Sequence, residues 1–251
     1  MKKTARTKAN KKSIFAIIIP VFNHEEMIAS VVNDAKKLGF PVIVVDDGST
    51  DSTYKNIKKI KGVTILRHNE NSGKGAAIMT GFQEAVKFAD WAITIDGDGQ
   101  HKPSDVFNLI KTIWPGTRPI VIGMREKMFG SDVPWTSRFG RGFSNFWVRL
   151  SGGPGVKDTQ SGFRIYPLPE SLELRVKAMR YQFELESIVK AKWKRMQIIE
   201  APISVSYSPG TRRVSHFRPF VDFMRNSNVF TRLIFARIFV PSFIRAKKKQ
   251  Q

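Results

Sequence analysis

The stretch VVDDGSTD at residues 44–51 and the stretch TIDGDGQH at residues 94–101 decide the fold of this chain. Each begins with apolar residues that favour a buried β-strand and turns acidic where the strand is expected to end. Segments with helical periodicity lie between such apolar runs. This alternation is typical of an α/β fold, a mostly parallel sheet flanked by helices that binds ligands at the carboxyl ends of its strands. We therefore expect both acidic stretches at one edge of one sheet.

Apolar runs predict five strands in the first half of the chain, at residues 15–20, 42–45, 63–67, 91–95 and 119–122. Periodic segments predict helices at residues 26–37, 53–60, 76–88 and 104–113. Further along, we expect a helix at 137–150, a strand at 162–166, a helix at 183–194 and a strand at 197–205. No internal repeat or long linker interrupts this order. Residues 13–210 are thus expected to form one domain, between a basic tail at 1–12 and a basic amphipathic segment at 211–251.

The chain is strongly basic, with 42 Lys and Arg against 21 Asp and Glu and a net charge of +21. Most of the excess lies at the ends, since residues 1–12 hold six basic and no acidic groups and residues 211–251 hold ten basic and one acidic group. Such ends solubilise a protein, bind nucleic acid or attach to anionic membranes. The absence of cysteine excludes disulfides, thiolate metal sites and cysteine nucleophiles.

The C-terminal segment is too interrupted by arginine and proline to span a bilayer, which needs about 20 mostly apolar residues. On a helical wheel, Arg218, Arg225 and Arg232 fall on one face, opposite an apolar face. The apolar face consists of Phe220, Phe223, Met224, Phe230, Ile234 and Ile238. We expect this helix to lie in the headgroup region of an anionic membrane, with no nucleic acid as a partner. A helix packed on the domain with its arginines in water is the alternative.

The carboxylates of Asp46, Asp47, Asp96 and Asp98 would repel one another at one sheet edge unless a cation or hydrogen-bond donors neutralised them. The spacing of Asp96, Asp98 and Gln100 suits oxygen ligation of a hard divalent ion, Mg²⁺ or Mn²⁺, that would also hold a diphosphate. Two ordinary turns are the alternative, because Asp and Gly are common in turns. Two such clusters at strand ends of one α/β unit favour the metal.

The chain resembles the family 2 glycosyltransferases of the GT-A fold, and within them the dolichol-phosphate mannose synthases and polyprenyl-phosphate glycosyltransferases. The matching stretches are IIIPVFNHEE at 17–26, VVDDGSTD at 44–51, NSGKGAAIMTGF at 71–82, TIDGDGQH at 94–101, GMR at 123–125 and DTQSGFRIY at 158–166. The resemblance implies a metal-dependent, inverting enzyme that moves a sugar from a UDP- or GDP-linked donor to a membrane lipid, a polyprenyl phosphate. It would act as a peripheral protein at the cytoplasmic face of a membrane.

Two alternatives to this function are kept open. Within the enzyme class, the acceptor would be a hydroxyl of another lipid or of a glycan. Outside it, the chain would be a basic protein that binds nucleic acid or a lipid surface without catalysis. The acidic residues at the strand ends argue against nucleic acid, because phosphate binding would not select four carboxylates at one edge.

The resemblance also implies roles in donor binding. Pro20 and Phe22 would border the nucleotide base, the Asp46 and Asp47 pair would contact the base or ribose, and Asp96 would line the nucleotide-sugar site. Many relatives have a glutamate directly after the asparagine of the first motif. This chain has His24 there and Glu25 next, which puts the ribose contact at Glu25 in doubt.

Basic residues are expected around the donor phosphates. Lys74 is followed by Gly75, whereas a P-loop requires Ser or Thr at that place, so nucleotide hydrolysis by a P-loop is excluded. Lys74 is expected to contact a donor phosphate or simply to begin a helix. Arg212 and Arg213, in SPGTRRVSH, resemble the basic loop that closes over the donor diphosphate in relatives.

In the resembling family the DTQSGFR motif lies beneath the acceptor, so Asp158 is expected to orient or deprotonate it. A lipid phosphate is already nucleophilic at neutral pH and needs positioning rather than a strong base, whereas a hydroxyl acceptor would need Asp158 as a base. Arg125 and Arg138 are the candidates for holding the acceptor phosphate. Arg164 would assist them or pair with a buried carboxylate. Glu184 is a candidate pocket residue, with an ordinary carboxylate at a helix start as the preferred interpretation.

Overall fold

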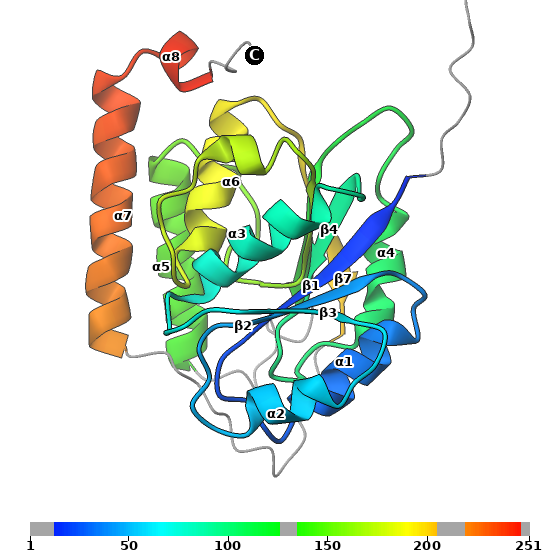
Figure 1. Cartoon of the computed structure of the whole chain (residues 1–251). Coiled ribbons are helices and arrows are strands. Elements are labelled where there is room, and N and C mark those ends of the chain that lie inside the picture. Colours follow the sequence, from blue (N-terminus) through cyan, green and yellow to red (C-terminus); the bar gives the residue numbers. More distant parts are fainter. Residues whose placement is uncertain (1–12, 126–134, 205–218, 247–251) are drawn as a thin grey trace, which may run out of the picture.

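A computed structural model describes residues 13–125, 135–204 and 219–246, without the side chains of residues 135–139, 219–225 and 246. Its centre is a seven-stranded sheet in the order β3-β2-β1-β4-β6-β5-β7 (Figure 1). The strands are β1 (Phe15–Val21), β2 (Val42–Asp46), β3 (Thr64–Arg67), β4 (Trp91–Thr94), β5 (Ile120–Arg125), β6 (Arg164–Pro167) and β7 (Ile198–Ile203). All neighbours are parallel except β6, which is antiparallel to β4 and β5. The predicted α/β fold with a mostly parallel sheet is confirmed.

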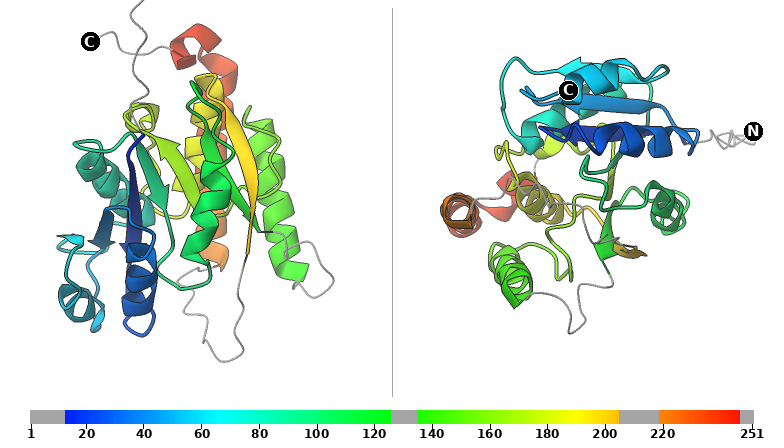
Figure 2. Two further views of the ribbon diagram at one scale, coloured as in Figure 1. Left: turned by 90° about the vertical axis from the view of Figure 1, so that its right-hand side faces the viewer. Right: turned by 90° about the horizontal axis from the view of Figure 1, so that it is seen from below.

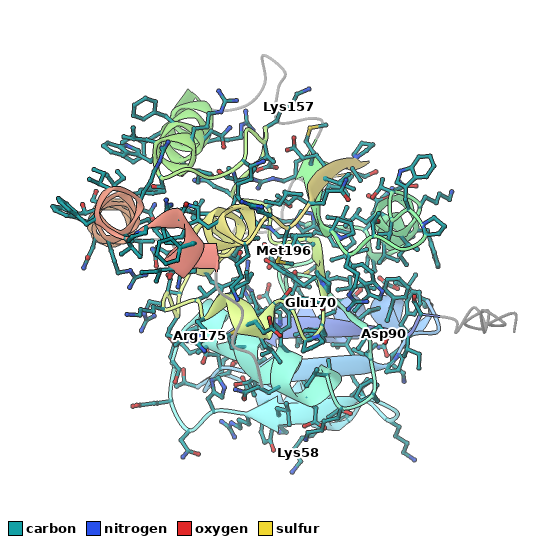
Figure 3. All side chains as sticks on the ribbon, turned by 90° about the horizontal axis from the view of Figure 1, so that it is seen from above. Lys58, Asp90, Lys157, Glu170, Arg175 and Met196 are labelled. Carbon is teal, nitrogen blue, oxygen red and sulfur yellow. The ribbon has the colours of Figure 1, made fainter. Side chains whose placement is uncertain are left out.

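Helices cover both faces of the sheet, as two views at right angles show (Figure 2). They are α1 (Ile28–Lys36), α2 (Thr53–Lys58), α3 (Lys74–Ala85), α4 (Val106–Ile110), α5 (Trp135–Leu150), α6 (Phe183–Trp193), α7 (Pro219–Phe239) and α8 (Ser242–Ala246). Two apolar cores result, because alternate residues of each strand point to opposite faces. In β1, Ile18 packs with α3 and α6, whereas Ile17 and Ile19 pack with α1 and α4. Side chains fill the space between these layers (Figure 3).

The expected elements are present, with shifted ends. The first helix begins at Ile28 rather than at residue 26, because Asn23 has a positive φ of 53° and the chain turns before it becomes helical. The third helix begins at Lys74, two residues earlier than expected. The fourth is shorter than expected, since a 3-10 turn, Pro103–Asp105, takes its first residues.

The C-terminal helix α7 packs on the domain, and the predicted division of its faces is wrong in part. Phe230, expected on the membrane side, is 2% exposed and stacks on Trp147 of α5 with ring centroids 6.1 Å apart. Arg232, expected to face away from the apolar side, forms an ion pair of 2.5 Å with the buried Glu186 of α6. The helix carries a second apolar stripe, Phe230 with Leu233, and this stripe enters the core. No described helix is long and apolar enough to cross a bilayer.

Candidate active site

The carboxyl ends of β1, β2 and β4 bring the first two acidic motifs to one sheet edge, as expected. The carboxylate of Asp46, at the end of β2, is fully buried. Its Oδ2 lies 3.0 Å from Arg67 Nε, and its Oδ1 accepts a hydrogen bond of 3.1 Å from the backbone N–H of Ser49. Asp46 thus holds the DGST turn to strand β3.

Asp47 is also buried, and it holds the loop that precedes α3. Its Oδ1 lies 2.7 Å from His68 Nδ1 and accepts a hydrogen bond from the N–H of Ser72, while its Oδ2 accepts one of 2.7 Å from the N–H of Gly73. These donors compensate the burial of the carboxylate. Asp46 and Asp47 therefore shape the loops around the site through contacts inside the protein.

The loop after β1 carries the residues expected at the nucleotide base. Pro20 is buried near the end of β1, and Phe22 lies half-buried just beyond it. The Oδ1 of Asn23 accepts a hydrogen bond of 2.9 Å from the N–H of Thr50, which joins this loop to the DGST turn. The Oε2 of Glu25 accepts one of 2.7 Å from the backbone N–H of Ser52, so Glu25 is turned toward the start of α2.

Lys74, the first residue of α3, lies between two carboxylates. Its Nζ is 2.7 Å from Asp96 Oδ1 and 2.6 Å from Glu184 Oε1. Burial alone would lower the pKa of Lys74, but Asp96 and Glu184 outweigh it and raise that pKa, so the ammonium stays charged. Burial would raise the pKa of Asp96, and Lys74 outweighs this and lowers it. The three side chains form a partly buried charged cluster at the carboxyl edge, in which Glu184 is the most buried.

Two glycines allow this cluster to form. A Cβ on Gly75 would lie 2.7 Å from Cβ of Phe183, so the glycine lets the first turn of α3 approach the start of α6, where Glu184 sits. A Cβ on Gly162 would lie 2.5 Å from Lys74 Nζ and 2.6 Å from both carboxylate oxygens of Asp96. Sequence reasoning missed Glu184 as a partner of Lys74. The available signal was that each residue stands in the first turn of a helix next to a predicted strand end.

Asp98 and Gln100 follow Asp96 in a tight turn, in which Asp98 Oδ1 accepts a hydrogen bond of 3.0 Å from the N–H of Gln100. Burial and the neighbouring charge of Asp96 raise the pKa of Asp98. Within the described residues, no three His, Cys, Asp or Glu side chains are grouped so that they could hold a metal ion. The available donors are two carboxylates and one amide oxygen. This hard-oxygen set fits the way Mg²⁺ binds at many phosphate sites, through one or two carboxylates together with substrate phosphates.

Asp158 and Arg125 form a bidentate ion pair. Arg125 Nε lies 2.7 Å from Asp158 Oδ2 and Nη2 lies 2.8 Å from Oδ1, and Asp158 is 1% exposed. Burial would raise the pKa of Asp158, but the Arg125 guanidinium outweighs it and holds that pKa below its usual value. The sequence placed both residues at the acceptor, and the structure brings them together at the end of β5.

The segment around Asp158 is fixed from three sides. Glu200 Oε1 on β7 accepts hydrogen bonds from the N–H groups of Lys157 and Asp158, at 2.8 and 3.0 Å. Asn145 on α5 donates to the carbonyl of Lys157. Arg164, fully buried, donates to the carbonyls of Thr159, Ser161 and Glu184. Arg164 therefore binds carbonyls rather than the buried carboxylate or acceptor expected for it, and it ties this segment to α6.

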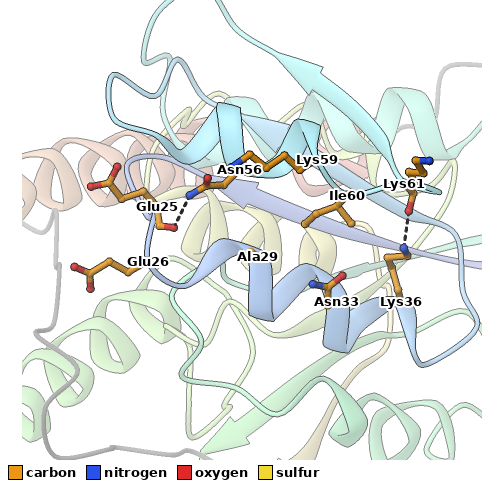
Figure 4. Close-up of a pocket in the computed structure, with 9 residues that line it drawn as sticks. All are labelled: Glu25, Glu26, Ala29, Asn33, Lys36, Asn56, Lys59, Ile60 and Lys61. Carbon is orange, nitrogen blue, oxygen red and sulfur yellow. Dashed lines mark hydrogen bonds between the residues drawn. The ribbon is translucent and has the colours of Figure 1, made fainter.

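Three expected site residues have no described side chain. Arg138 lies in α5, but its side chain is outside the described part, and Arg212 and Arg213 are outside it altogether. A groove of about 610 Å³ lies between α1 and α2, lined by Glu25, Asn33, Lys36, Asn56 and Lys61 among others (Figure 4). Of the expected donor residues, Glu25 alone lines it, so the groove is separate from the charged cluster around Lys74.

The sequence profile described as glycosyl transferase family 2 matches residues 16–168, which include all of the motifs quoted from the sequence. The chain belongs to glycosyltransferase family 2. It is 34% identical over 215 residues to the UDP-N-acetylglucosamine--dolichyl-phosphate N-acetylglucosaminyltransferase of Methanococcus voltae, covering 76% of this chain and 85% of that protein. It is 29% identical over 228 residues to the dolichyl-phosphate beta-glucosyltransferase of Saccharomyces cerevisiae, covering 78% and 67%.

This family 2 glycosyltransferase also has the fold of solved relatives. Glucosyl-3-phosphoglycerate synthase from Mycobacterium tuberculosis, crystallised with Mn²⁺, UDP and phosphoglyceric acid, matches with a TM-score of 0.65 at 18% identity. The match covers 92% of this chain and 80% of that one. At this identity the likeness shows the GT-A fold. The chain is thus a glycosyltransferase enzyme of the GT-A fold, related to dolichyl-phosphate glycosyltransferases.

Proposed function

We propose that this glycosyltransferase inverts the anomeric centre as it transfers a sugar from a nucleotide-sugar to the phosphate of a polyprenyl phosphate of the dolichyl type. The preference for a phosphate acceptor over a hydroxyl acceptor rests on the bidentate ion pair of Asp158 with Arg125. A hydroxyl acceptor needs a base to take its proton, and Asp158 is a poor base because Arg125 occupies both of its oxygens and lowers its pKa. A phosphate acceptor presents an oxyanion and needs no such base.

The relatives support the same acceptor class. The proteins of Methanococcus voltae and Saccharomyces cerevisiae are both named for dolichyl phosphate, and each aligns with more than three quarters of this chain. Since they differ in the sugar named, the comparison supports the lipid more than the sugar. We accordingly propose a peripheral enzyme at the cytoplasmic face of a membrane.

In the proposed reaction an oxygen of the lipid phosphate attacks the anomeric carbon from the side opposite the nucleoside diphosphate. The new carbon–oxygen bond forms as the bond to the diphosphate breaks, and its electron pair leaves with the nucleoside diphosphate. Arg125, held by Asp158, would bind the acceptor phosphate, with Arg138 as a second candidate. Because acceptor and leaving group are both anions, the main task of the side chains is positioning and charge compensation.

At the donor, we propose that Lys74 contacts the diphosphate and that Asp96, Asp98 and Gln100 hold Mg²⁺ or Mn²⁺. The ion would neutralise charge on the departing diphosphate. Pro20 and Phe22 are proposed for the base, and Arg212 and Arg213 for the diphosphate.

Asp46, Asp47 and Glu25 were expected at the base and ribose. The partners of Asp46 and Asp47 inside the protein support a role in holding the base-side loops, and direct contact with the nucleoside would displace Arg67 or His68. Glu25 would have to leave Ser52 to bind the ribose.

The test uses one lipid in two forms, dolichyl phosphate and dolichol, so that only the nucleophile differs. A panel of UDP- and GDP-sugars is supplied with Mn²⁺, and NMR determines the anomeric configuration of the product. We expect product from dolichyl phosphate alone, with the configuration of the donor inverted. Transfer to dolichol without product from the phosphate would overturn the acceptor, and retained configuration would overturn inversion.

A further inference from the structure

Large apolar side chains gather in solvent on the outer surface of α5, the second half of α7 and α8. Each of them is between 42% and 72% exposed: Phe146, Leu150, Phe235, Ile238, Phe239, Phe243 and Ile244. We call this set the α5–α7–α8 surface. In α7 these residues point away from Phe230 and Leu233, which are 2% exposed and face the core. The helix therefore has an apolar stripe on both sides, one buried and one open.

The three helices form one continuous surface. Trp147 of α5 stacks on Phe230 of α7, and Arg237 of α7 donates to the carbonyl of Leu150. On α8, the Arg245 guanidinium lies 5.0 Å from the ring centroid of Trp193 of α6, which fixes α8 to the domain. Helices α5 and α7 lie side by side on the side of the molecule away from α4 (Figures 1 and 2).

The helices of this surface are basic in sequence, although Arg141 of α5 is buried and Arg232 of α7 pairs with Glu186. The sequences of α5, α7 and α8 contain seven arginines and one acidic residue, Asp222. The described chain ends at α8, next to this surface, whereas it begins at β1, on the side of the molecule away from α7 (Figures 1 and 2). The basic stretch 247–251 follows α8 directly in the sequence. Exposed apolar residues with a basic surround fit the interface of an anionic bilayer, where apolar side chains enter the acyl boundary and arginines bind the headgroups.

We propose that the α5–α7–α8 surface binds a bilayer rich in anionic phospholipids, with α5 and α7 lying along the membrane plane. A second copy of this chain fits less well, because two such surfaces would bring arginines of like charge together. The membrane contact is thus assigned to Phe235, Ile238 and Phe239, and not to Phe230, which α5 covers. The inference deepens the proposed function and rests on it for the lipid acceptor.

The direction of α5 and α7 relates this surface to the carboxyl edge of the sheet. Helix α5 follows β5, whose last residue is Arg125, and α7 follows β7, which runs parallel to β5. Both helices therefore start at the carboxyl edge of the sheet and run back along the domain. The exposed apolar residues lie in the later turns of these helices and in α8, so the surface lies toward the end of the domain away from the edge that carries Arg125 and Asp158.

The experiment compares the full chain with the double variant Phe235→Ser/Phe239→Ser by cosedimentation with vesicles. One set contains phosphatidylcholine alone and the other a mixture with phosphatidylglycerol. The matched control is Phe107→Ser/Trp114→Ser, which removes two exposed aromatic residues from α4 and the segment after it, and α4 lies on the side of the molecule away from α7. We expect the wild type and the control to bind the anionic vesicles. The double variant should bind them at least about tenfold more weakly.

Equal binding by the double variant, equal loss in the control, or equal binding of the wild type to neutral vesicles would overturn the proposal. So would a wild-type dimer that the double variant converts to monomers in light scattering. A second assay, sugar transfer to detergent-solubilised dolichyl phosphate, distinguishes a failure of the proposed membrane surface from a failure of the proposed function. The double variant is expected to keep that activity, and a wild type that binds vesicles but transfers no sugar in detergent would refute the acceptor and leave the surface standing.

Discussion

Asp158 holds the guanidinium of Arg125 with both of its carboxylate oxygens, at 2.7 and 2.8 Å, at the edge of the sheet where the acceptor is expected. A carboxylate used in this way fixes the orientation of an arginine, and its basicity falls. Under the proposed function, Asp158 is a positioning residue for Arg125, and its loss should affect acceptor binding more than the chemical step.

The variant Asp158→Asn tests this role, because the amide keeps the size of the side chain but loses its charge. We expect the KM for dolichyl phosphate to rise roughly tenfold, with a smaller change in kcat. If Asp158 were a base, kcat of the wild type would fall at acidic pH and this fall would be missing in the variant. We expect instead the same pH dependence of kcat in both proteins. The control Asp34→Asn removes an exposed carboxylate that pairs with Lys37 and should leave both constants unchanged. A large fall in kcat with unchanged KM would instead indicate a base.

The same pair makes a prediction about stability and pH. The pKa of Asp158 is lower in the folded protein than the 3.8 of an unperturbed Asp, so the unfolded state takes up a proton first as pH falls. The contribution of the pair is therefore complete at neutral pH and is lost as pH drops below about 4. Urea unfolding should show the wild type about 3 kcal/mol more stable than Asp158→Asn at pH 7. This difference should shrink at pH 3, and a difference that grew with acidity would contradict the assignment.

Lys74, which is partly buried, can be compared with an exposed lysine. Lys74→Met leaves Asp96 and Glu184 as neighbouring carboxylates without their shared cation, which should cost about 3 kcal/mol of unfolding free energy and most of the donor binding. Lys87→Met removes a lysine that is 64% exposed and pairs with Glu84, and should cost at most about 1 kcal/mol. Urea unfolding and calorimetric titration with UDP-sugars measure both effects. Equal costs in the two variants would show that the Lys74 cluster contributes no more to stability than an exposed ion pair.

The fold followed from the sequence because buried strands carry runs of Val and Ile, and their order with helices determines a parallel sheet. The antiparallel direction of β6 did not follow, since an apolar run carries no information about direction. Likewise, the wheel of α7 showed an apolar face but could not tell which stripe the domain covers. Phe230 became a core residue because Trp147 lies opposite it, and this pairing between distant segments leaves no periodic pattern in the sequence.

Residues of the candidate site could be predicted from the sequence where they belong to a motif. Asp96 and Lys74 were placed near the donor from their own motifs, and the structure puts them in contact. Glu184 was not, because its contact with Lys74 depends on the close approach of two helix starts at Gly75. Asp46 and Asp47 show the opposite case. Their acidic motif was expected at the base or ribose, and in the structure both carboxylates bind other groups of the protein.

Gly162 tests how tightly the charged cluster is packed. A methyl group there would lie 2.5 Å from Lys74 Nζ, the end of a flexible side chain, so the fold can adjust while the contact with Asp96 is lost. We expect Gly162→Ala to lower donor affinity at least about fivefold with an unfolding free energy changed by about 1 kcal/mol or less. Gly140→Ala on α5 is the matched control, because nothing lies within 4 Å of its added methyl group. Normal donor affinity in Gly162→Ala would show that the donor does not need this arrangement.

Asp98 tests the proposed metal site. Asp98→Ala should leave the unfolding free energy within about 1 kcal/mol of the wild type, since the side chain is only half-buried. It should abolish turnover at any Mn²⁺ concentration, because a Mg²⁺ or Mn²⁺ ion held with a diphosphate depends on its one or two carboxylate ligands. Calorimetry measures the effect of the metal on UDP binding separately from turnover. Mn²⁺ should strengthen UDP binding to the wild type and to the control Asp34→Ala, and should leave UDP binding to Asp98→Ala unchanged. Full turnover in Asp98→Ala, or wild-type turnover that survives EDTA, would remove the metal from the proposed mechanism and leave Lys74 and the arginines to balance the charge of the diphosphate.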